Sequence, residues 1–299
     1  MGLNEAEVKR SILTTLSYHN FFDYPLTKKE IIKYFISSSK KNANLSIINQ
    51  TLNKLVCQKI IEEKNGFYFL KNKKDLVFLR KKRKKYSQKK LKIAKNFLKY
   101  LKLIPWIKMI AVTGALAMEN SSKDDDIDLF IITQENRLWL TRLLLIVILI
   151  IIGKRPEITK YKKDIKDKIC PNLFLDERAL GLKKSRQNLF IAHEIAQSKP
   201  ILNKDNTYQN FLSQNKWVEN YLVNAFQEID FDWLIINKHN KKNNNKALFL
   251  LNRFCYKLQV VYMKSKKTSE QINLNSAFFH LSKDRGKEIL KKVFKNMPA

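Results

Sequence analysis

The first part of the chain alternates apolar stripes of helical spacing with short polar breaks. One such stripe runs from Val8 to Leu16. Thr27 and Glu30 have the spacing of a capping box, which predicts the start of a second helix. The pair Asn65-Gly66 separates two apolar stretches and is typical of a two-residue hairpin turn, because both positions tolerate positive φ. Three helices followed by a hairpin predict a winged helix–turn–helix over residues 1–74.

The third apolar helix of this region covers Ser46 to Cys57 and carries only one charged residue, Lys54. In a winged helix this is the element that enters a nucleic-acid groove. A single charge gives weak support to that role. The module therefore has two interpretations, one as a nucleic-acid reader and one as a protein-contacting or substrate-positioning module.

Residues 75–104 predict one long connecting helix with an apolar stripe. They hold 12 basic residues against one acid, Asp75. A solvated connector would explain this pattern, and so would a surface that follows the phosphates of RNA or DNA. Six consecutive basic residues repel one another, and a bound polyanion would reduce that repulsion. We therefore expect contact with nucleic acid. The residues concerned are Arg80, Lys81, Lys82, Arg83, Lys84 and Lys85.

An acidic stretch interrupts this basic background between two apolar strands. The first predicted strand ends at Thr113, and the second begins at Ile127. Gly114 lets the backbone approach a phosphate closely, and the short helix that Gly114 and Ala115 open directs free N–H groups toward it. We therefore expect Thr113, Gly114 and Ala115 to contact a nucleotide.

Asp126 and Asp128 flank Ile127 at the start of the second strand, so in extended backbone their side chains share one face while Ile127 packs on the other. The alternative pair, Asp124 and Asp126, would place Asp125 in the core. Two carboxylates on one face repel one another unless a divalent cation lies between them. Mg²⁺ accepts one or two carboxylates together with phosphate oxygens. Asp126 and Asp128 are therefore the expected metal ligands.

The order Gly114-Ala115, ten residues, then Asp126-Ile127-Asp128 resembles the signature of the DNA polymerase β-like nucleotidyltransferase superfamily. The chain also resembles uncharacterised bacterial members that carry a winged helix ahead of that domain. The resemblance implies a small mixed-sheet core, two Mg²⁺ ions, and transfer of a nucleoside monophosphate from an NTP to an acceptor. The acceptor is not readable from the sequence.

The chain departs from that signature at two places. Ala115 stands where the superfamily usually has Gly or Ser. The third carboxylate falls on a predicted strand that holds both Asn172 and Asp176. With Asp176 in the catalytic position the triad would be complete. With Asn172 there, the general base would be missing, and the chain would be a winged-helix binding or regulatory protein with a degenerate nucleotidyltransferase domain.

Composition narrows the remaining function classes. The 299 residues include 58 Lys+Arg and 27 Asp+Glu, a formal net charge of +31. Lys, Asn and Ile are abundant throughout, as codon bias in an AT-rich genome would produce, yet a basic balance still favours a polyanionic partner. The six glycines form neither a dinucleotide-binding fingerprint nor a P-loop, and the four histidines and three cysteines form no zinc motif. The cysteine usage and polar start indicate a cytoplasmic protein.

One segment, Leu143 to Ile152, is wholly apolar. Ten residues make about 15 Å of helix, half of a roughly 30 Å hydrocarbon core. We therefore expect a buried helix and no membrane insertion. The predicted class is α+β, with a winged helix (1–74), a basic connector helix (75–104), a nucleotidyltransferase core (105–183) and a helical C-terminal region (184–299).

Overall fold

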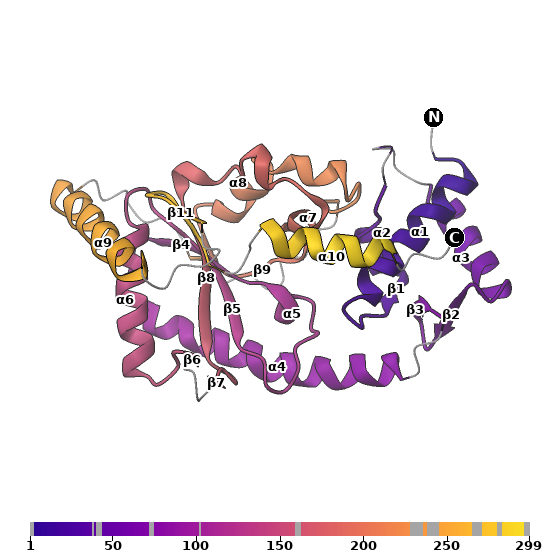
Figure 1. The fold of residues 1–299 in the computed structure, drawn as a ribbon, viewed down its shortest axis with the longest axis horizontal. Helices are drawn as coiled ribbons and strands as arrows, with labels where there is room; N and C mark the ends of the chain where they lie inside the picture. The colour runs from indigo at the N-terminus through magenta and orange to yellow at the C-terminus, as the bar shows by residue number, and fades with distance from the viewer. Residues whose placement is uncertain are drawn as a thin grey trace.

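The structure is a computed structural model of the chain and combines helices with three β-sheets (Figure 1). It describes residues 3–37, 39, 44–71, 75–101, 103–158, 163–227, 236–237, 245–264, 271–279 and 283–295. A seven-stranded sheet lies in one half of the molecule, and the N-terminal elements lie in the other. The mixed helix and strand content agrees with the predicted α+β class.

The N-terminal elements are three helices and a three-stranded antiparallel sheet of order β1-β3-β2. They follow in the order α1 (Glu5–Asn20), β1 (Leu26–Thr27), α2 (Lys28–Lys33), α3 (Leu45–Cys57), β2 (Ile61–Lys64) and β3 (Phe67–Leu70). Thr27 and Glu30 form the predicted capping box, in which each side chain accepts a hydrogen bond from the other residue's backbone. Asn65 and Gly66 join β2 to β3 with φ values of 56° and 79°, so the predicted hairpin turn is confirmed.

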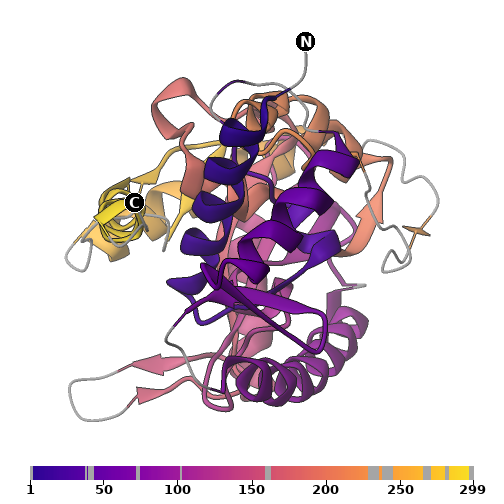
Figure 2. The same cartoon turned by 90° about the vertical axis from the view of Figure 1, so that its right-hand side faces the viewer.

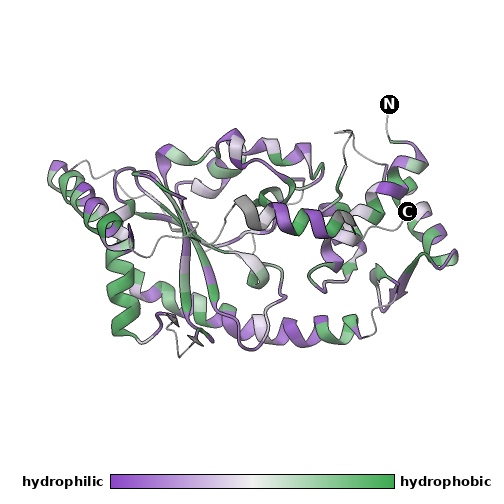
Figure 3. Cartoon of the chain, in the orientation of Figure 1, coloured by the Kyte–Doolittle hydropathy of each residue, from purple (hydrophilic) through white to green (hydrophobic). Residues whose placement is uncertain are grey.

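A single long helix, α4 (Leu76–Leu101), follows β3 and runs along the lower edge of the molecule in Figure 1. It reaches from the N-terminal elements to the large sheet, and its polar middle is evident in Figure 3. In Figure 2, where the molecule is turned by 90°, the N-terminal helices lie in front of the sheet. The hairpin of β6 (Glu157–Ile158) and β7 (Lys163–Asp164) projects from one side of this view.

The large sheet has the order β10-β9-β4-β5-β8-β12-β11. Its strands are β4 (Ile107–Val112), β5 (Ile127–Thr133), β8 (Ile169–Asp176), β9 (Lys199–Lys204), β10 (Ile236–Asn237), β11 (Gln271–Ile272) and β12 (Ser276–Phe278). The β5–β8 pair is parallel, whereas β4 pairs antiparallel with both β5 and β9. Four strands therefore come from the region expected to be helical, residues 184–299. The expectation of a helical region is therefore wrong. β10, β11 and β12 have only two or three residues each, too few to show an alternating pattern, and the four central residues of β9 are buried in a continuous run without alternation.

The remaining helices cover the two faces of this sheet. They are α5 (Gly114–Ala117), α6 (Leu138–Ile151), α7 (Leu189–Gln197), α8 (Thr207–Ser213), α9 (Lys246–Lys264) and α10 (Lys283–Lys295). Short 3₁₀ turns lie at Glu177–Ala179, Lys184–Arg186 and Lys216–Asn220. Ile127, Leu129 and Ile131 pack with α4 and α6, as predicted for the core face of β5. Phe130 and Ile132, on the opposite face, share a core with α1, α7 and α10.

The apolar segment Leu143–Ile152 lies mostly in α6 and is buried on only one face. Leu145 and Leu149 are at most 1% exposed, whereas Ile150 and Ile151 are 54% and 77% exposed. The expectation of a buried helix is thus correct for the face that meets the sheet and α9, and wrong for the other. Among the described residues, no helix has the length and apolar character needed to cross a membrane.

Candidate functional site

The turn between β4 and α5 places a glycine directly beside an aspartate. Gly114 has a φ of +57°, and a Cβ added there would lie 3.3 Å from Oδ2 of Asp128. The Thr113 N–H donates to the backbone oxygen of Asp128 at 3.1 Å, which fixes the turn against β5. A side chain at position 114 would therefore be both strained and crowded. α5 itself is only four residues long.

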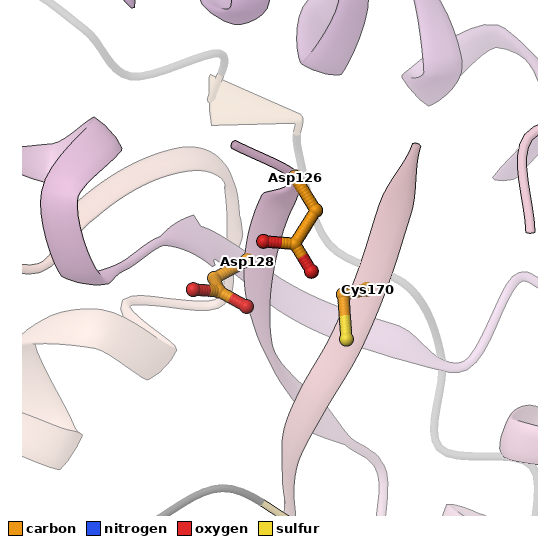
Figure 4. Close-up of side chains that lie close together, drawn as sticks. All are labelled: Asp126, Asp128 and Cys170. Atoms are coloured by element: carbon orange, nitrogen blue, oxygen red, sulfur yellow. The ribbon is translucent and has the colours of Figure 1, made fainter. Parts of the chain in front are cut away.

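The carboxylates of Asp126 and Asp128 lie close together at the start of β5, beside this turn (Figure 4). One ligand atom from each of them and Sγ of Cys170 lie within 4.8 Å of one another, and all three residues are half-buried. Asp128 stands opposite Cys170 in the parallel β5–β8 register. The structure thus brings together the two aspartates that the sequence singled out, and it adds a thiol from the neighbouring strand.

The two preceding aspartates point to other partners. Asp125 accepts hydrogen bonds from the backbone N–H and the hydroxyl of Ser122, at 2.7 Å and 2.6 Å. Asp124 lies 3.8 Å from the Lys166 ammonium, and its side chain is 79% exposed. These contacts support Asp126 and Asp128 over the alternative pair.

Asn172, and not Asp176, reaches this pair. The amide Nδ2 of Asn172 donates to Oδ1 of Asp128 at 2.7 Å, from a position where the β5–β8 register shifts by one residue. Asp176 lies opposite Thr133 at the far end of β8 and is fully buried. There it accepts a hydrogen bond at 2.8 Å from the Arg178 guanidinium. The structure therefore does not place Asp176 with Asp126 and Asp128.

Cys170 is the site residue that sequence reasoning missed. Burial raises the pKa of its thiol, and the charges of Asp128 and then Asp126 raise it further. The thiol is therefore protonated at neutral pH and is a poor ligand for a hard cation such as Mg²⁺. Its place on the strand that holds Asn172 was visible in the sequence, but its position opposite Asp128 depends on a strand pairing that was not.

The aspartate pair lies at a cavity of about 310 Å³. Thr113, Gly114 and Ala115 line it together with Asn172. Further walls come from α1, α7 and the apolar face of the sheet. The expected nucleotide-contacting turn and the metal-ligand candidates thus border one cavity of ligand size.

The basic run on α4 divides into buried and exposed members. Arg80 is 7% exposed; its guanidinium lies 2.7 Å from the Glu30 carboxylate and stacks over the Tyr24 ring at 3.6 Å. Burial acts to raise the pKa of Glu30, but the charge of Arg80 and hydrogen bonds from Arg80, Thr27 and Tyr24 together hold this pKa below its ordinary value. Arg83 is half-buried and donates to Phe22 and Asn120. The exposed members are Lys81, Lys82, Lys84 and Lys85.

The expectation that all six basic residues face a polyanion is therefore corrected. Arg80 joins α4 to the N-terminal helices, because a guanidinium can satisfy a buried carboxylate and a backbone carbonyl together. Lys90, further along α4, joins this helix to the segments that precede β5 and β8: its almost fully buried ammonium donates to the Asp125 backbone oxygen and to the Asp167 carboxylate, each at 2.7 Å.

No family model, curated protein or solved structure matches the chain. The chemistry of the site is therefore inferred from its own residues.

Proposed function

We propose that the chain is a Mg²⁺-dependent nucleotidyltransferase that moves a nucleoside monophosphate from an NTP to an acceptor. The observation that carries this proposal is the juxtaposition of three features: the Asp126 and Asp128 carboxylates, the Gly114 turn, and the cavity they share. Nucleotidyl transfer needs a place for a triphosphate beside a place for metal ions. The resemblance of the Gly114–Asp128 segment to the polymerase β-like superfamily supports the same conclusion.

The two carboxylates of the site are ligands of the kind that Mg²⁺ accepts. Asp126 and Asp128 would hold the ions, and the backbone of Thr113, Gly114 and Ala115 would contact the phosphates. When bound, Mg²⁺ supplies charge stabilisation to the phosphates and to the attacking oxygen. No lysine or arginine appears among the described residues that line the cavity. Metal ions would therefore carry most of the neutralisation of the triphosphate.

A second candidate function follows from Asn172. An amide occupies the place beside Asp128 where the superfamily implies a third carboxylate, and an amide does not accept a proton as a general base. In this alternative, the chain binds nucleotide without transferring it. The order α1-β1-α2-α3-β2-β3 supports a winged helix, which would then serve as a nucleic-acid or protein contact controlled by nucleotide.

Incubation of the purified protein with α-³²P-labelled NTPs, Mg²⁺ and a small-molecule or RNA extract distinguishes these two functions. The enzyme transfers label to an acceptor and releases pyrophosphate, and Asp128→Asn removes both signals. Mg²⁺-dependent NTP binding without transfer would support the binding module. Absence of NTP binding would refute both.

A further inference from the structure

The cavity beside the aspartate pair has mainly apolar and aromatic walls. The sheet contributes Phe130, and α7 contributes Phe190 and Ile195. Tyr18 on α1 and Phe22, which follows that helix, also border the space. α10 closes it through Ile289, because that helix packs against both α1 and α7. Such walls suit the apolar body of a small molecule and offer little to a polynucleotide backbone.

The charge of this cavity is opposite to that of the protein. The chain has a net charge of +31, yet the charged residues among the described lining are all acids. They are Asp125, Asp126, Asp128 and Glu194. Glu194 belongs to α7, apart from the metal-ligand candidates, and it accepts a hydrogen bond from Gln197 at 2.7 Å. A carboxylate among aromatic rings favours a cationic group, which both the charge and the ring faces attract.

Two buried polar atoms of the lining have no hydrogen-bond partner within the described part of the chain. They are Nε2 of His19 and Oγ of Ser121, on residues that are 3% and 1% exposed. Both residues border the cavity. Burial lowers the pKa of His19 to about 3, so this ring is neutral and adds no positive charge. Buried polar atoms without partners cost stability, and because both atoms are shielded from the cavity, a ligand reaches them only if the wall rearranges.

We propose that this cavity binds a small molecule with an apolar, aromatic body and an ammonium group, with the ammonium held at Glu194. The body packs against Phe190 and Ile195. This binding does not depend on nucleotidyl transfer. If the transfer reaction is confirmed, such a molecule is the class of acceptor that the cavity selects.

The test uses three probes that share one apolar body and differ in charge: 4-phenylbutylamine, 4-phenylbutan-1-ol and 5-phenylpentanoate. Calorimetric titration into the full-length protein, without NTP or Mg²⁺, gives the affinity of each. We expect the amine to bind at least tenfold more tightly than the carboxylate, a difference of about 1.4 kcal/mol. Glu194→Gln should reduce the affinity of the amine to that of the alcohol. Glu219→Gln, an exposed acid outside the cavity, is the matched control and should change nothing.

If a variant does not fold, amide hydrogen exchange on the wild-type protein provides a second test of where the amine binds. On the wild-type protein, the amine should slow exchange in α7 and at the end of α1. Equal affinities for amine and carboxylate, no response to Glu194→Gln in a folded variant, or protection elsewhere would overturn the proposal. If the transfer assay fails but the amine binds as expected, the nucleotidyltransferase proposal is wrong and the amine-site proposal is supported. If transfer is observed but the amine does not bind as expected, the amine-site proposal is wrong and the nucleotidyltransferase proposal is supported.

Discussion

The side-chain amide of Asn172 donates a hydrogen bond of 2.7 Å to Oδ1 of Asp128. This bond joins β8 to β5 near the strand ends where the two aspartates meet, and an N–H donor favours a charged carboxylate over a neutral one. It also occupies one of the oxygens available for a metal ion. Asn172 therefore stabilises the metal-free site and limits what the site can do as a base.

Asn172→Asp should lower the stability of the metal-free protein and raise its affinity for Mg²⁺. A third carboxylate replaces a donor with a like charge, so the metal-free protein should lose about 1–3 kcal/mol of unfolding free energy. Mg²⁺ should restore that loss, because it binds only the folded site. Thermal unfolding with and without Mg²⁺ measures both effects. An equal Mg²⁺ response in the wild type and the variant would show that Asn172 does not adjoin a metal site.

Arg80 should behave differently from its neighbours in the basic run. Arg80→Gln leaves the buried Glu30 carboxylate without its cation and removes the stacking on Tyr24. The expected loss is about 3–5 kcal/mol. Lys82→Gln, at an exposed position two residues along the same helix, should change stability by less than about 0.5 kcal/mol. Urea denaturation measures both, and equal effects would contradict the structural role of Arg80.

Nucleic-acid binding through α4, if present, depends on the exposed lysines alone. Replacement of Lys81, Lys82 and Lys85 together by glutamine should flatten the salt dependence of RNA or DNA affinity. The expected change is about 0.7–0.9 in log K per log salt for each lost phosphate contact. Fluorescence anisotropy across a salt series provides the measurement. An unchanged slope would show that these lysines contact no phosphate.

Two buried histidines should make the fold sensitive to acid. Burial lowers the pKa of His19 to about 3, and burial together with His19 lowers the pKa of His193 well below its ordinary 6.5. Both are neutral in the folded state, so the unfolded chain binds the extra protons between pH 6.5 and about 3. Stability is therefore fully present above pH 6.5 and falls with acidification, by up to about 1.4 kcal/mol per pH unit for each histidine.

His193→Phe tests this pH dependence. The His193 ring stacks on Tyr18 at 3.9 Å, and neither of its nitrogens has a hydrogen-bond partner within the described residues. Phenylalanine keeps the stack and removes two unsatisfied polar atoms, so stability should hold or rise at pH 7 and decline less steeply toward pH 4. Denaturation midpoints measured at several pH values test this. An unchanged pH slope would contradict a neutral, buried His193.

Local signals in the sequence predicted those features that neighbouring residues determine. The Thr27–Glu30 capping box and the Asn65-Gly66 turn each depend on a few adjacent positions, and both are present. The shared face of Asp126 and Asp128 likewise follows from strand periodicity alone. These features needed no knowledge of which strands pair.

Features set by distant contacts were not predictable in the same way. Cys170 and Asn172 reach Asp128 only because β8 pairs parallel with β5 and shifts register between them. The sequence alone assigns Arg80 to the expected nucleic-acid surface, because its partner Glu30 lies on α2, 50 residues earlier in the chain. The strand β12 has only three residues, and the places of β9 and β12 in the sheet depend on their pairing with β4 and β8.

The most direct test of the account is the stabilisation of the protein by Mg²⁺ and NTP in aspartate variants. At 100 times the dissociation constant a ligand adds about 2.7 kcal/mol, which is easily seen as a rise in melting temperature. We predict this rise for the wild type and for Asp124→Asn, and its loss in Asp126→Asn and Asp128→Asn. The metal-free melting temperature of Asp126→Asn should hold or rise, because one of two adjacent charges is removed. Equal stabilisation in all four proteins, or its loss only in Asp124→Asn, would contradict the assignment of Asp126 and Asp128 as the metal-binding pair.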